Sequence, residues 1–192
     1  RTQVPGRTKK WEKTIKICFL SRICEHKGLD ILIDALLQIQ GYNIEFSIFG
    51  PIQEKEYWNT CREKLKQTEI SWTYKGDVPS EEVQSVLSTQ DILVLPTKSE
   101  NYGHVVFEAL SVGCIPIISD RTPWSLVESW KAGYVVSRTK EAFVRALTEY
   151  LNISIEDKNE MVDNAVKLAK YKVEQSKIKT GYREIFELRG NR

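Results

Sequence analysis

Two acidic side chains, Glu100 and Glu108, lie before and within a short segment that is otherwise almost entirely apolar. The segment starts at Gly103 and stops at Gly113, and glycine is common just past the end of a helix. A helix that is apolar nearly all round is normally buried, where a carboxylate is tolerated only if another group pairs with it or uses it. Glu100 precedes the same helix, where the backbone N–H groups favour a negative charge. Both acids are therefore candidates for a functional site.

A second candidate is the basic stretch that contains Arg22, His26 and Lys27, immediately before a predicted helix starting at Gly28. Cations are unfavourable at the amino end of a helix, because that end already carries a partial positive charge. A phosphate or diphosphate between Arg22, Lys27 and the free backbone N–H groups would reverse this effect. The alternative is that both cations are ordinary solvated surface residues.

Each residue near Gly103 also has a structural interpretation. Glu100 could cap the helix or simply be exposed, and Glu108 could be a buried acid paired with a lysine or arginine. His104 could be a polar cap at the entrance of the helix. Tyr102 could pack in the core or form one wall of a ligand site.

The apolar pattern predicts strands that alternate with helices along the chain. The expected strands span residues 15–20, 44–49, 70–74, 91–95, 115–119 and 134–136. Helices are expected at residues 28–40, 103–113, 139–151 and 174–188. Three more are expected: one that ends near residue 69, one that begins at residues 79–80, and one that begins at a capping box at residues 154–157. This alternation is typical of an α/β fold, a doubly wound, Rossmann-like parallel sheet of about six strands with helices on both faces.

Ligands of a sheet with strand order 3-2-1-4-5-6 bind beyond the carboxyl ends of the first and fourth strands. The loops at residues 21–28 and 96–103 are therefore expected to meet at one anion pocket. We expect the two cations Arg22 and Lys27 on one wall of this pocket and the two acids on the other.

Composition narrows the class of protein. The 192 residues carry a formal net charge of +2 without a basic stripe, which argues against a nucleic-acid partner. No apolar run reaches the length of a membrane span. The four cysteines show no paired spacing, so we interpret them as reduced thiols of a cytoplasmic protein.

Five motifs occur in order at the predicted elements, namely Leu20–Gly28, Phe49–Pro51, Lys75–Pro79, Asp91–Pro96 and Ser99–Leu110. Together they resemble the carboxyl-terminal lobe of the retaining GT-B glycosyltransferases called glycosyl transferases group 1. The resemblance spans roughly residues 15–136, and five motifs in the right order are far more specific than one.

The resemblance implies that the chain binds a nucleotide-diphosphate sugar, with a UDP- or GDP-sugar expected. Arg22 and Lys27 match the positions that neutralise the donor diphosphate, Glu100 the position that holds sugar hydroxyls, and Glu108 the position that holds the ribose. The implied catalytic residues are Arg22, Lys27 and Glu100. The further donor-binding positions are Asn101, Tyr102, Gly103, His104, Val105, Gly76 and Val78.

The implied reaction is metal-independent transfer of a hexose-type sugar to a saccharide or glycoconjugate in polysaccharide biosynthesis, with no cofactor. The chain contains no Asp-any-Asp motif, in agreement with a family that stabilises the leaving group with side chains. Two positions depart from the family pattern. Ser21 stands where glycine is common, and only Gly50 remains of a Gly-any-Gly-Pro loop.

The family also has an amino-terminal lobe that binds the acceptor. We expect residues 1–14 to be a linker from that lobe, residues 15–172 to form the nucleotide-sugar domain and residues 173–192 a helix whose apolar side chains face the missing lobe. The chain alone should bind donor weakly and transfer nothing. We expect a cytoplasmic location, with peripheral membrane contact only through a lipid-linked acceptor. The alternatives are a GT-B relative that epimerises or phosphorylyses sugars, and a non-catalytic nucleotide-binding module.

Overall fold

The computed structural model describes the backbone of residues 14–189 and the side chains of residues 14–176. Its centre is one six-stranded sheet in the order β3-β2-β1-β4-β5-β6, and every neighbouring pair of strands is parallel. The strands are β1 (Ile15–Leu20), β2 (Ile44–Phe49), β3 (Ser71–Gly76), β4 (Ile92–Leu95), β5 (Ile115–Ser119) and β6 (Tyr134–Val136). The predicted doubly wound fold and strand order are confirmed.

Burial follows the position of each strand in the sheet. All residues of β4 and β5 are buried, as expected for continuous apolar strands covered on both faces. The edge strand β3 instead alternates between exposed and half-buried residues. It extends from Ser71 to Gly76, beyond the predicted end at residue 74, because Gly76 still pairs with Phe49 after an irregularity in the register.

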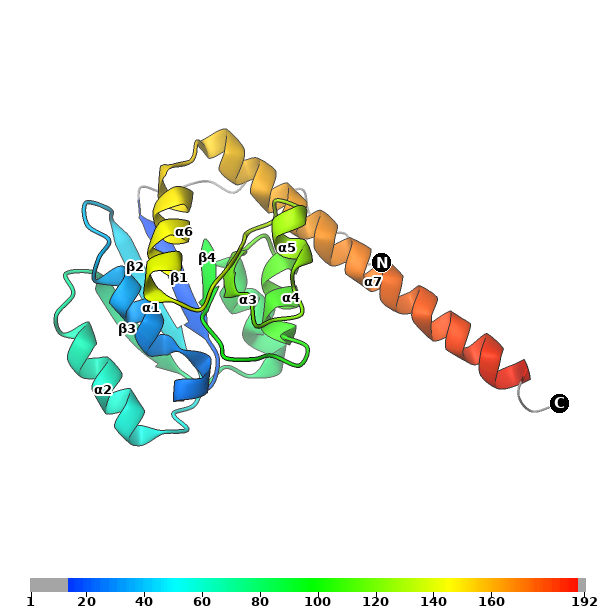
Figure 1. The fold of residues 1–192 in the computed structure, drawn as a ribbon, viewed down its shortest axis with the longest axis horizontal. Coiled ribbons are helices and arrows are strands. Elements are labelled where there is room, and N and C mark those ends of the chain that lie inside the picture. The colour runs from blue at the N-terminus through cyan, green and yellow to red at the C-terminus, as the bar shows by residue number, and fades with distance from the viewer. Residues whose placement is uncertain (1–13, 190–192) are drawn as a thin grey trace.

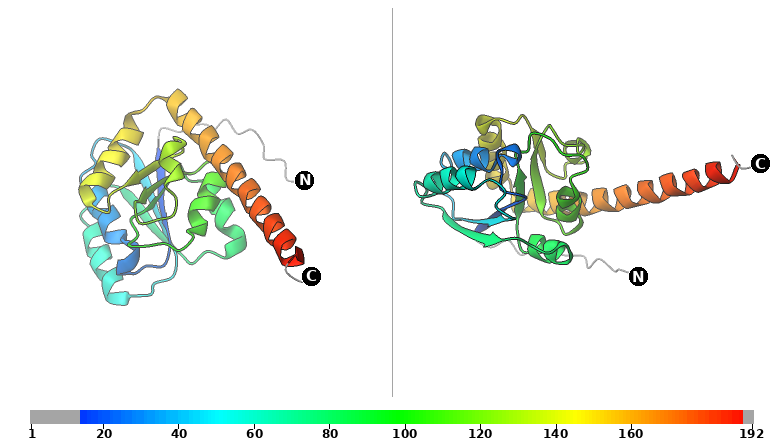
Figure 2. Two further views of the ribbon diagram at one scale, coloured as in Figure 1. Left: turned by 45° about the vertical axis from the view of Figure 1, so that its right-hand side comes forward. Right: turned by 90° about the horizontal axis from the view of Figure 1, so that it is seen from below.

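Helices cover both faces of the sheet (Figures 1 and 2). They are α1 (Leu29–Leu36), α2 (Lys55–Leu65), α3 (Val83–Ser88), α4 (His104–Ser111), α5 (Leu126–Ser129), α6 (Lys140–Asn152) and α7 (Ile155–Arg189), with short 3-10 turns η1 (Glu25–Lys27) and η2 (Ser80–Glu82). Alternate residues of β1 face opposite layers: Ile17 and Phe19 join the larger core, whereas Cys18 joins the smaller core under α3 and α4. The four cysteines are free, as predicted, and the structure shows that all four are buried.

The last part of the chain differs from the prediction. One half of the expected capping box is present, because the Ser154 hydroxyl accepts a hydrogen bond from the Asp157 N–H at 3.0 Å. The Asp157 carboxylate accepts from the Ser154 hydroxyl at 2.8 Å. The helix that begins there, α7, does not end before residue 174 but continues to Arg189. The prediction of a separate final helix at residues 174–188 was therefore wrong. Neither glycine nor proline occurs between residues 155 and 180 to interrupt it.

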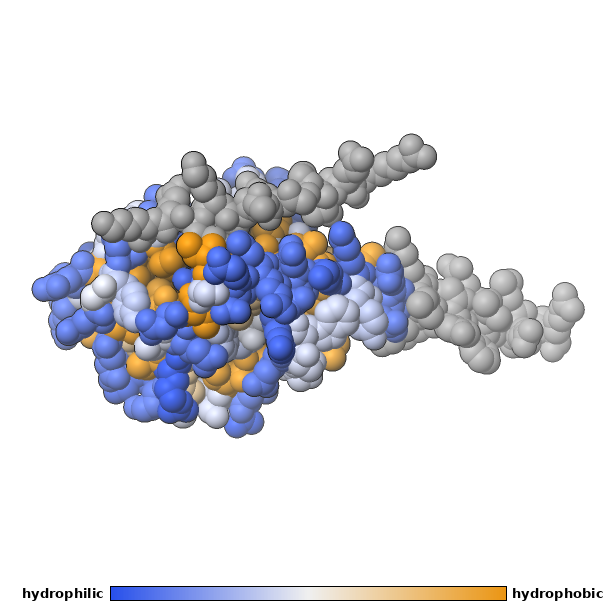
Figure 3. All heavy atoms as spheres, turned by 90° about the horizontal axis from the view of Figure 1, so that it is seen from above, coloured by the Kyte–Doolittle hydropathy of each residue, from blue (hydrophilic) through white to orange (hydrophobic). Residues whose placement is uncertain are grey.

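The long helix α7 extends well past the α/β body (Figures 1 and 2). The predicted apolar surface of its last turns lies outside the described side chains, as does most of the predicted linker at residues 1–14. Among the described residues, no helix is both long and apolar enough to cross a membrane. Figure 3 shows one face of the molecule, where hydrophilic residues surround smaller groups of apolar ones.

Candidate functional site

The loops that follow β1 (residues 21–28, the β1 loop) and β4 (residues 96–103, the β4 loop) meet at the carboxyl edge of the sheet, as predicted. The Lys98 N–H donates a hydrogen bond to the His26 carbonyl at 2.8 Å. The His26 ring nitrogen Nε2 lies 3.0 Å from the Ser99 hydroxyl. Because the two loops are joined through main chain and side chains, residues from both can act on one ligand.

Gly28 shows how closely the two loops approach. It has a φ of +74°, in the left-handed region, and it ends η1 and begins α1. A Cβ atom at this position would lie only 2.2 Å from the Pro96 carbonyl oxygen. The position therefore requires glycine for both its conformation and the space around it.

The ammonium group of Lys27 forms an ion pair with the carboxylate of Glu100. Lys27 is buried, so the alternative of a solvated surface cation is wrong for this residue. Glu100 is likewise a partner in an ion pair rather than a helix cap. The prediction that Lys27 and Glu100 lie on opposite walls of the pocket was therefore wrong. A buried ammonium group needs a counter-charge, and Glu100 supplies it.

Arg22 does not join this ion pair. Its side chain is exposed, and its guanidinium Nη1 donates a hydrogen bond to the Gln53 side-chain oxygen at 3.0 Å. Gln53 follows β2, which is the neighbour of β1 in the sheet. Arg22 therefore lies at the expected edge of the sheet, but its guanidinium contacts the loop after β2 instead of the two acids.

Glu108 lies one turn into α4 and is half-buried. Burial raises the pKa of its carboxyl group, and the neighbouring His104 partly offsets this effect. Glu108 forms no ion pair with any residue whose side chain is described, so the alternative of a paired buried acid is not supported there. A carboxylate that is partly removed from water without a cation is well suited to accept hydrogen bonds from hydroxyl groups.

The residues around Gly103 form the entrance of α4. Gly103 is the N-cap, with a φ of +69°, and no side chain caps the helix, so the interpretation of His104 as a polar cap was wrong. The His104 ring instead lies against the Tyr102 ring, with 4.5 Å between the ring centroids. Tyr102 is 53% exposed, which excludes a role in core packing, and Asn101 is also exposed. Val105 is half-buried against the core.

Gly76 and Val78 lie at the same edge of the sheet as the two loops. The Gly76 carbonyl accepts a hydrogen bond from the Gly50 N–H at 2.7 Å, which joins the ends of β2 and β3. Val78 is half-buried against the smaller core. Gly50 approaches the β1 loop closely, because a Cβ atom there would lie 2.0 Å from the Ser21 carbonyl oxygen. Ser21 and Gly50, the two positions that depart from the family pattern, are therefore in close contact with each other.

Two residues that the sequence analysis did not assign to the site support it. Arg138, which follows β6, donates hydrogen bonds to the carbonyl oxygens of Pro96 at 2.8 Å and Glu25 at 3.3 Å, so one guanidinium bridges both loops. Trp124, which follows β5, donates from its indole N–H to the Tyr102 carbonyl oxygen at 2.7 Å. The available signal was their position, since both come shortly after strands whose carboxyl ends share this edge.

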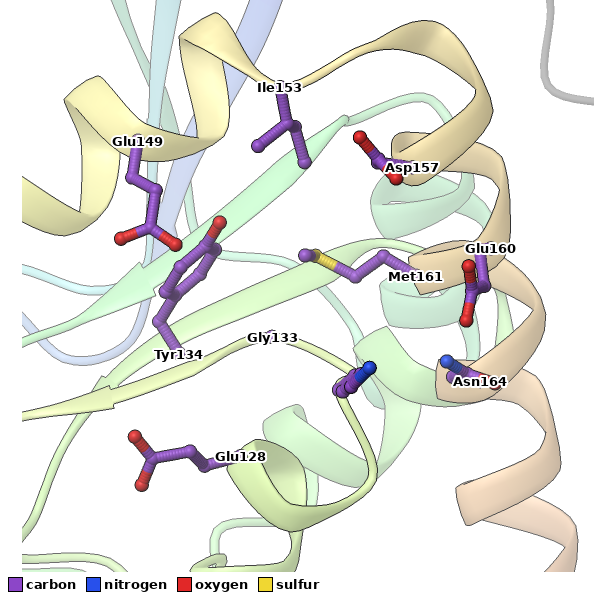
Figure 4. A pocket seen from close by; sticks show the side chains of 10 residues that line it. Glu128, Gly133, Tyr134, Glu149, Ile153, Asp157, Glu160, Met161 and Asn164 are labelled. Carbon is purple, nitrogen blue, oxygen red and sulfur yellow. The ribbon is translucent and has the colours of Figure 1, made fainter.

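Two described pockets lie at the opposite edge of the sheet. One, of about 390 Å³, is lined at the start of β6 and between α6 and α7 by acidic side chains with Tyr134 and Met161 (Figure 4). Burial and Glu149 raise the pKa of Tyr134 to about 12. The other, of about 620 Å³, is lined by residues 36–37, 39–44 and 67–71. Neither pocket contains a predicted site residue. Among the described residues, no three or more His, Cys, Asp or Glu side chains are grouped so that they could hold a metal ion.

The chain is similar to several known proteins. Among curated proteins, the chain is 28% identical over 165 residues to the glycogen synthase of Thermosipho melanesiensis. It is 29% identical over 170 residues to the putative colanic acid biosynthesis glycosyltransferase WcaL of Escherichia coli. These alignments cover 79% and 83% of this chain, but only 34% and 41% of the relatives. The chain thus spans well under half the length of either relative.

Solved structures show the same fold at low sequence identity. Anabaena Alr3699/HepE in complex with UDP and glucose has a TM-score of 0.79 at 16% identity, covering 91% of this chain and 48% of that one. The carboxyl-terminal domain of the glycosyl transferase group 1 family protein LpcC from Francisella tularensis has a TM-score of 0.74 at 20% identity. There the match covers 83% of this chain and 86% of the other.

A family model described as glycosyl transferases group 1 matches residues 1–168, which is most of the chain. This match agrees with the fold and with the relatives named above. The chain therefore belongs to the glycosyl transferases group 1 family.

Proposed function

We propose that this chain binds the nucleotide-diphosphate sugar of a retaining, metal-independent glycosyltransferase. The observation that carries the proposal is the meeting of Lys27 and Glu100 at the switch point of the sheet, where such folds bind ligands. The family membership and the solved complexes of Alr3699/HepE with UDP and UDP-glucose support a UDP-sugar or a related nucleotide sugar as the ligand.

Lys27 is assigned to the leaving diphosphate. When the glycosidic bond to the diphosphate breaks, negative charge grows on the phosphate oxygens, and a fixed ammonium group close to them stabilises that charge. Lys27 is buried and held in place, so little reorganisation is needed at that moment. Arg22 is the second cation, and it reaches the diphosphate if its exposed side chain turns from Gln53 toward the β1 loop.

Glu100 and Glu108 are assigned to hydroxyl groups of the donor. Glu100 accepts hydrogen bonds from the sugar, and the diphosphate then replaces it as the counter-charge of Lys27. Glu108 accepts from the ribose, because its half-buried carboxylate lacks a cationic partner among the described side chains. The N–H groups at the start of α4, from Gly103 to Val105, donate to the sugar or phosphate.

The proposed substrate is a hexose-type donor, and the proposed acceptor is a saccharide or glycoconjugate in polysaccharide synthesis. The acceptor would bind to a second lobe outside this chain, in keeping with the short span of the chain on its relatives. We therefore expect residues 15–172 to bind donor without transferring sugar. We propose a cytoplasmic location for the whole enzyme.

The experiment is isothermal titration of the 192-residue chain with a panel of UDP- and GDP-sugars and with UDP and GDP. We expect one nucleotide sugar and its nucleotide to bind. Lys27→Ala should weaken both by roughly tenfold or more, which corresponds to one charge-assisted contact. Glu100→Gln should weaken only the nucleotide sugar. Lys66→Ala, which removes an exposed lysine paired with Glu63, is the control and should change neither.

Absence of binding to the whole panel would contradict the proposal, as would equal losses in the Lys27 and Lys66 variants. Binding of nucleotides without preference for any nucleotide sugar would favour the non-catalytic nucleotide-binding module. Incubation of the full-length protein with the identified donor, followed by analysis of the sugar, separates transfer from epimerisation.

A further inference from the structure

The loop after β5, which contains Arg121 and Trp124, holds the β4 loop at two points. The Glu100 N–H donates a hydrogen bond to the Arg121 carbonyl oxygen at 3.2 Å. The Trp124 indole N–H donates to the Tyr102 carbonyl oxygen at 2.7 Å. These bonds secure both ends of the stretch from Glu100 to Tyr102, whose middle residue is exposed.

Trp124 itself has little freedom to move. It is only 2% exposed, and a buried indole N–H normally needs an acceptor. The Tyr102 ring meets it edge-on, with 6.3 Å between the centroids, and the ammonium group of Lys172 from α7 lies 5.1 Å from the ring centroid. A Cβ atom at Gly103 would lie 3.0 Å from the indole nitrogen, so backbone and indole are in close contact.

The hydrogen bond to Tyr102 determines the direction of the next amide group. The Tyr102 carbonyl and the Gly103 N–H belong to one planar peptide, and in a trans peptide they point in opposite directions. No cis peptide occurs among the described residues. Because Trp124 holds the carbonyl, the Gly103 N–H must point away from the indole. A glycine at this position would otherwise allow the peptide plane to rotate easily.

We propose that Trp124 is a positioning residue that presents the Gly103 N–H to a hydroxyl oxygen of the donor sugar. This inference rests on the proposed function, and it adds a residue that acts through the backbone rather than by touching the ligand. Replacing Trp124 should therefore weaken the recognition of the sugar part of the donor. The diphosphate, which is assigned to Lys27, should be recognised as before.

The test is Trp124→Phe, titrated with the nucleotide sugar that the wild-type chain binds and with the corresponding free nucleotide. We expect the affinity for the nucleotide sugar to fall by roughly tenfold, the scale of one hydrogen bond, and that for the nucleotide to change by less than about twofold. Trp130→Phe is the matched control. The Trp130 ring is tilted by 36° against the Tyr171 ring, with 5.2 Å between the ring centroids, and it should be replaceable without loss of binding to either ligand.

An NMR measurement of the Trp124 indole N–H complements the titration. The indole N–H resonance that disappears in Trp124→Phe identifies Trp124, and in the wild-type chain it should shift more with the nucleotide sugar than with the nucleotide. If Trp124→Phe does not fold, 3-benzothienylalanine at position 124 keeps the ring shape and replaces the N–H by sulfur.

The outcomes separate this role from a purely structural one and from the proposed function. Parallel losses of nucleotide and nucleotide sugar, or no loss of either, would overturn the role of Trp124 while leaving the donor-binding function intact. If the wild-type chain binds no nucleotide sugar, the proposed function fails first and the positioning role fails with it.

Discussion

The ammonium group of Lys27 forms an ion pair with the carboxylate of Glu100, and the two side chains come from the loops after β1 and β4. Their side chains are only 8% and 16% exposed. Both charges have lost most of their water, so each depends on the other for compensation. The pair therefore links the stability of the fold to the residues that we assign to the donor.

Breaking this ion pair should destabilise the chain. Lys27→Met should lower the free energy of unfolding by roughly 3 kcal/mol, because it leaves the Glu100 carboxylate buried without a cation. Lys27→Met combined with Glu100→Gln should be less destabilising than the sum of the two single changes. Urea unfolding of the wild-type chain and the three variants measures the coupling free energy between Lys27 and Glu100. Strictly additive losses would show that the two charges do not depend on each other.

The exposed pair of Lys66 and Glu63 provides the control for this cycle. Its members are three residues apart and largely solvated. The same substitutions there should change the free energy of unfolding by about 0.5 kcal/mol or less.

Glu108 should make stability depend on pH. Burial raises its pKa in the folded state above the usual 4.5, so the folded state holds the proton more tightly than the unfolded state. The resulting stabilisation is complete below pH 4.5 and is lost as the pH rises through the raised pKa. At pH 7 the ionised carboxylate is therefore a net disadvantage to folding, although the proposed contact with the ribose requires it.

Glu108→Gln should therefore raise the melting temperature at pH 7, by about 1 °C because the group is partly solvated. The difference from the wild-type chain should shrink toward pH 4. Thermal melts between pH 4 and pH 8 measure it, with the exposed Glu63→Gln as control. A lower melting temperature for Glu108→Gln at pH 7 would mean that a cation compensates Glu108. Under the proposed function, the same variant should bind the nucleotide sugar more weakly.

Gly28 and Gly41 allow the close contact between the β1 and β4 loops to be tested separately from backbone strain. Both have a positive φ, +74° and +82°, but nothing lies within 4 Å of a Cβ atom built at Gly41. Gly41→Ala should lower the free energy of unfolding by about 1 kcal/mol, the cost of the left-handed conformation alone. Gly28→Ala should cost about 3 kcal/mol or more, because its methyl group also meets the Pro96 carbonyl. Equal losses in urea unfolding would argue against the close approach.

Most of the sheet could be predicted from the sequence. The bounds of β1, β2, β5 and β6 agree with the predicted ones, because short apolar runs between polar turns are distinct signals. The end of β3 was missed because an edge strand has few apolar residues and its length depends on its pairing with β2. The continuity of α7 was missed because the polar segment was divided into two helices, although no glycine or proline separates them between residues 155 and 180.

The candidate site could be predicted in part. Topology alone predicted that the loops carrying Lys27 and Glu100 meet, since the carboxyl ends of neighbouring parallel strands share an edge. It did not predict the direct ion pair between the two side chains, which were expected on opposite walls of a pocket. The direction of the Arg22 side chain could not be predicted, because a long exposed side chain has several rotamers and its partner Gln53 lies on another loop. The contacts of Arg138 and Trp124 likewise depend on distances between loops far apart in sequence.

Arg138 should be needed for its geometry rather than for its charge alone. Its planar guanidinium donates to the carbonyl oxygens of Pro96 and Glu25, and a lysine has no comparable fork of donors. Arg138→Lys should therefore lower the free energy of unfolding by about 1–2 kcal/mol, although the charge is kept. Arg145→Lys, a change of an exposed arginine on α6, is the matched control and should stay within about 0.5 kcal/mol.

Hydrogen exchange locates the effect of Arg138→Lys. Amide protons of the β1 loop (residues 21–28) and the β4 loop (residues 96–103) should exchange faster in this variant, because the bridge between the two loops is lost. Amides of β2, which Arg138 does not contact, should exchange as in the wild-type chain after correction for global stability. Uniformly faster exchange across the sheet would contradict a local bridge and would assign Arg138 a role in the stability of the whole fold.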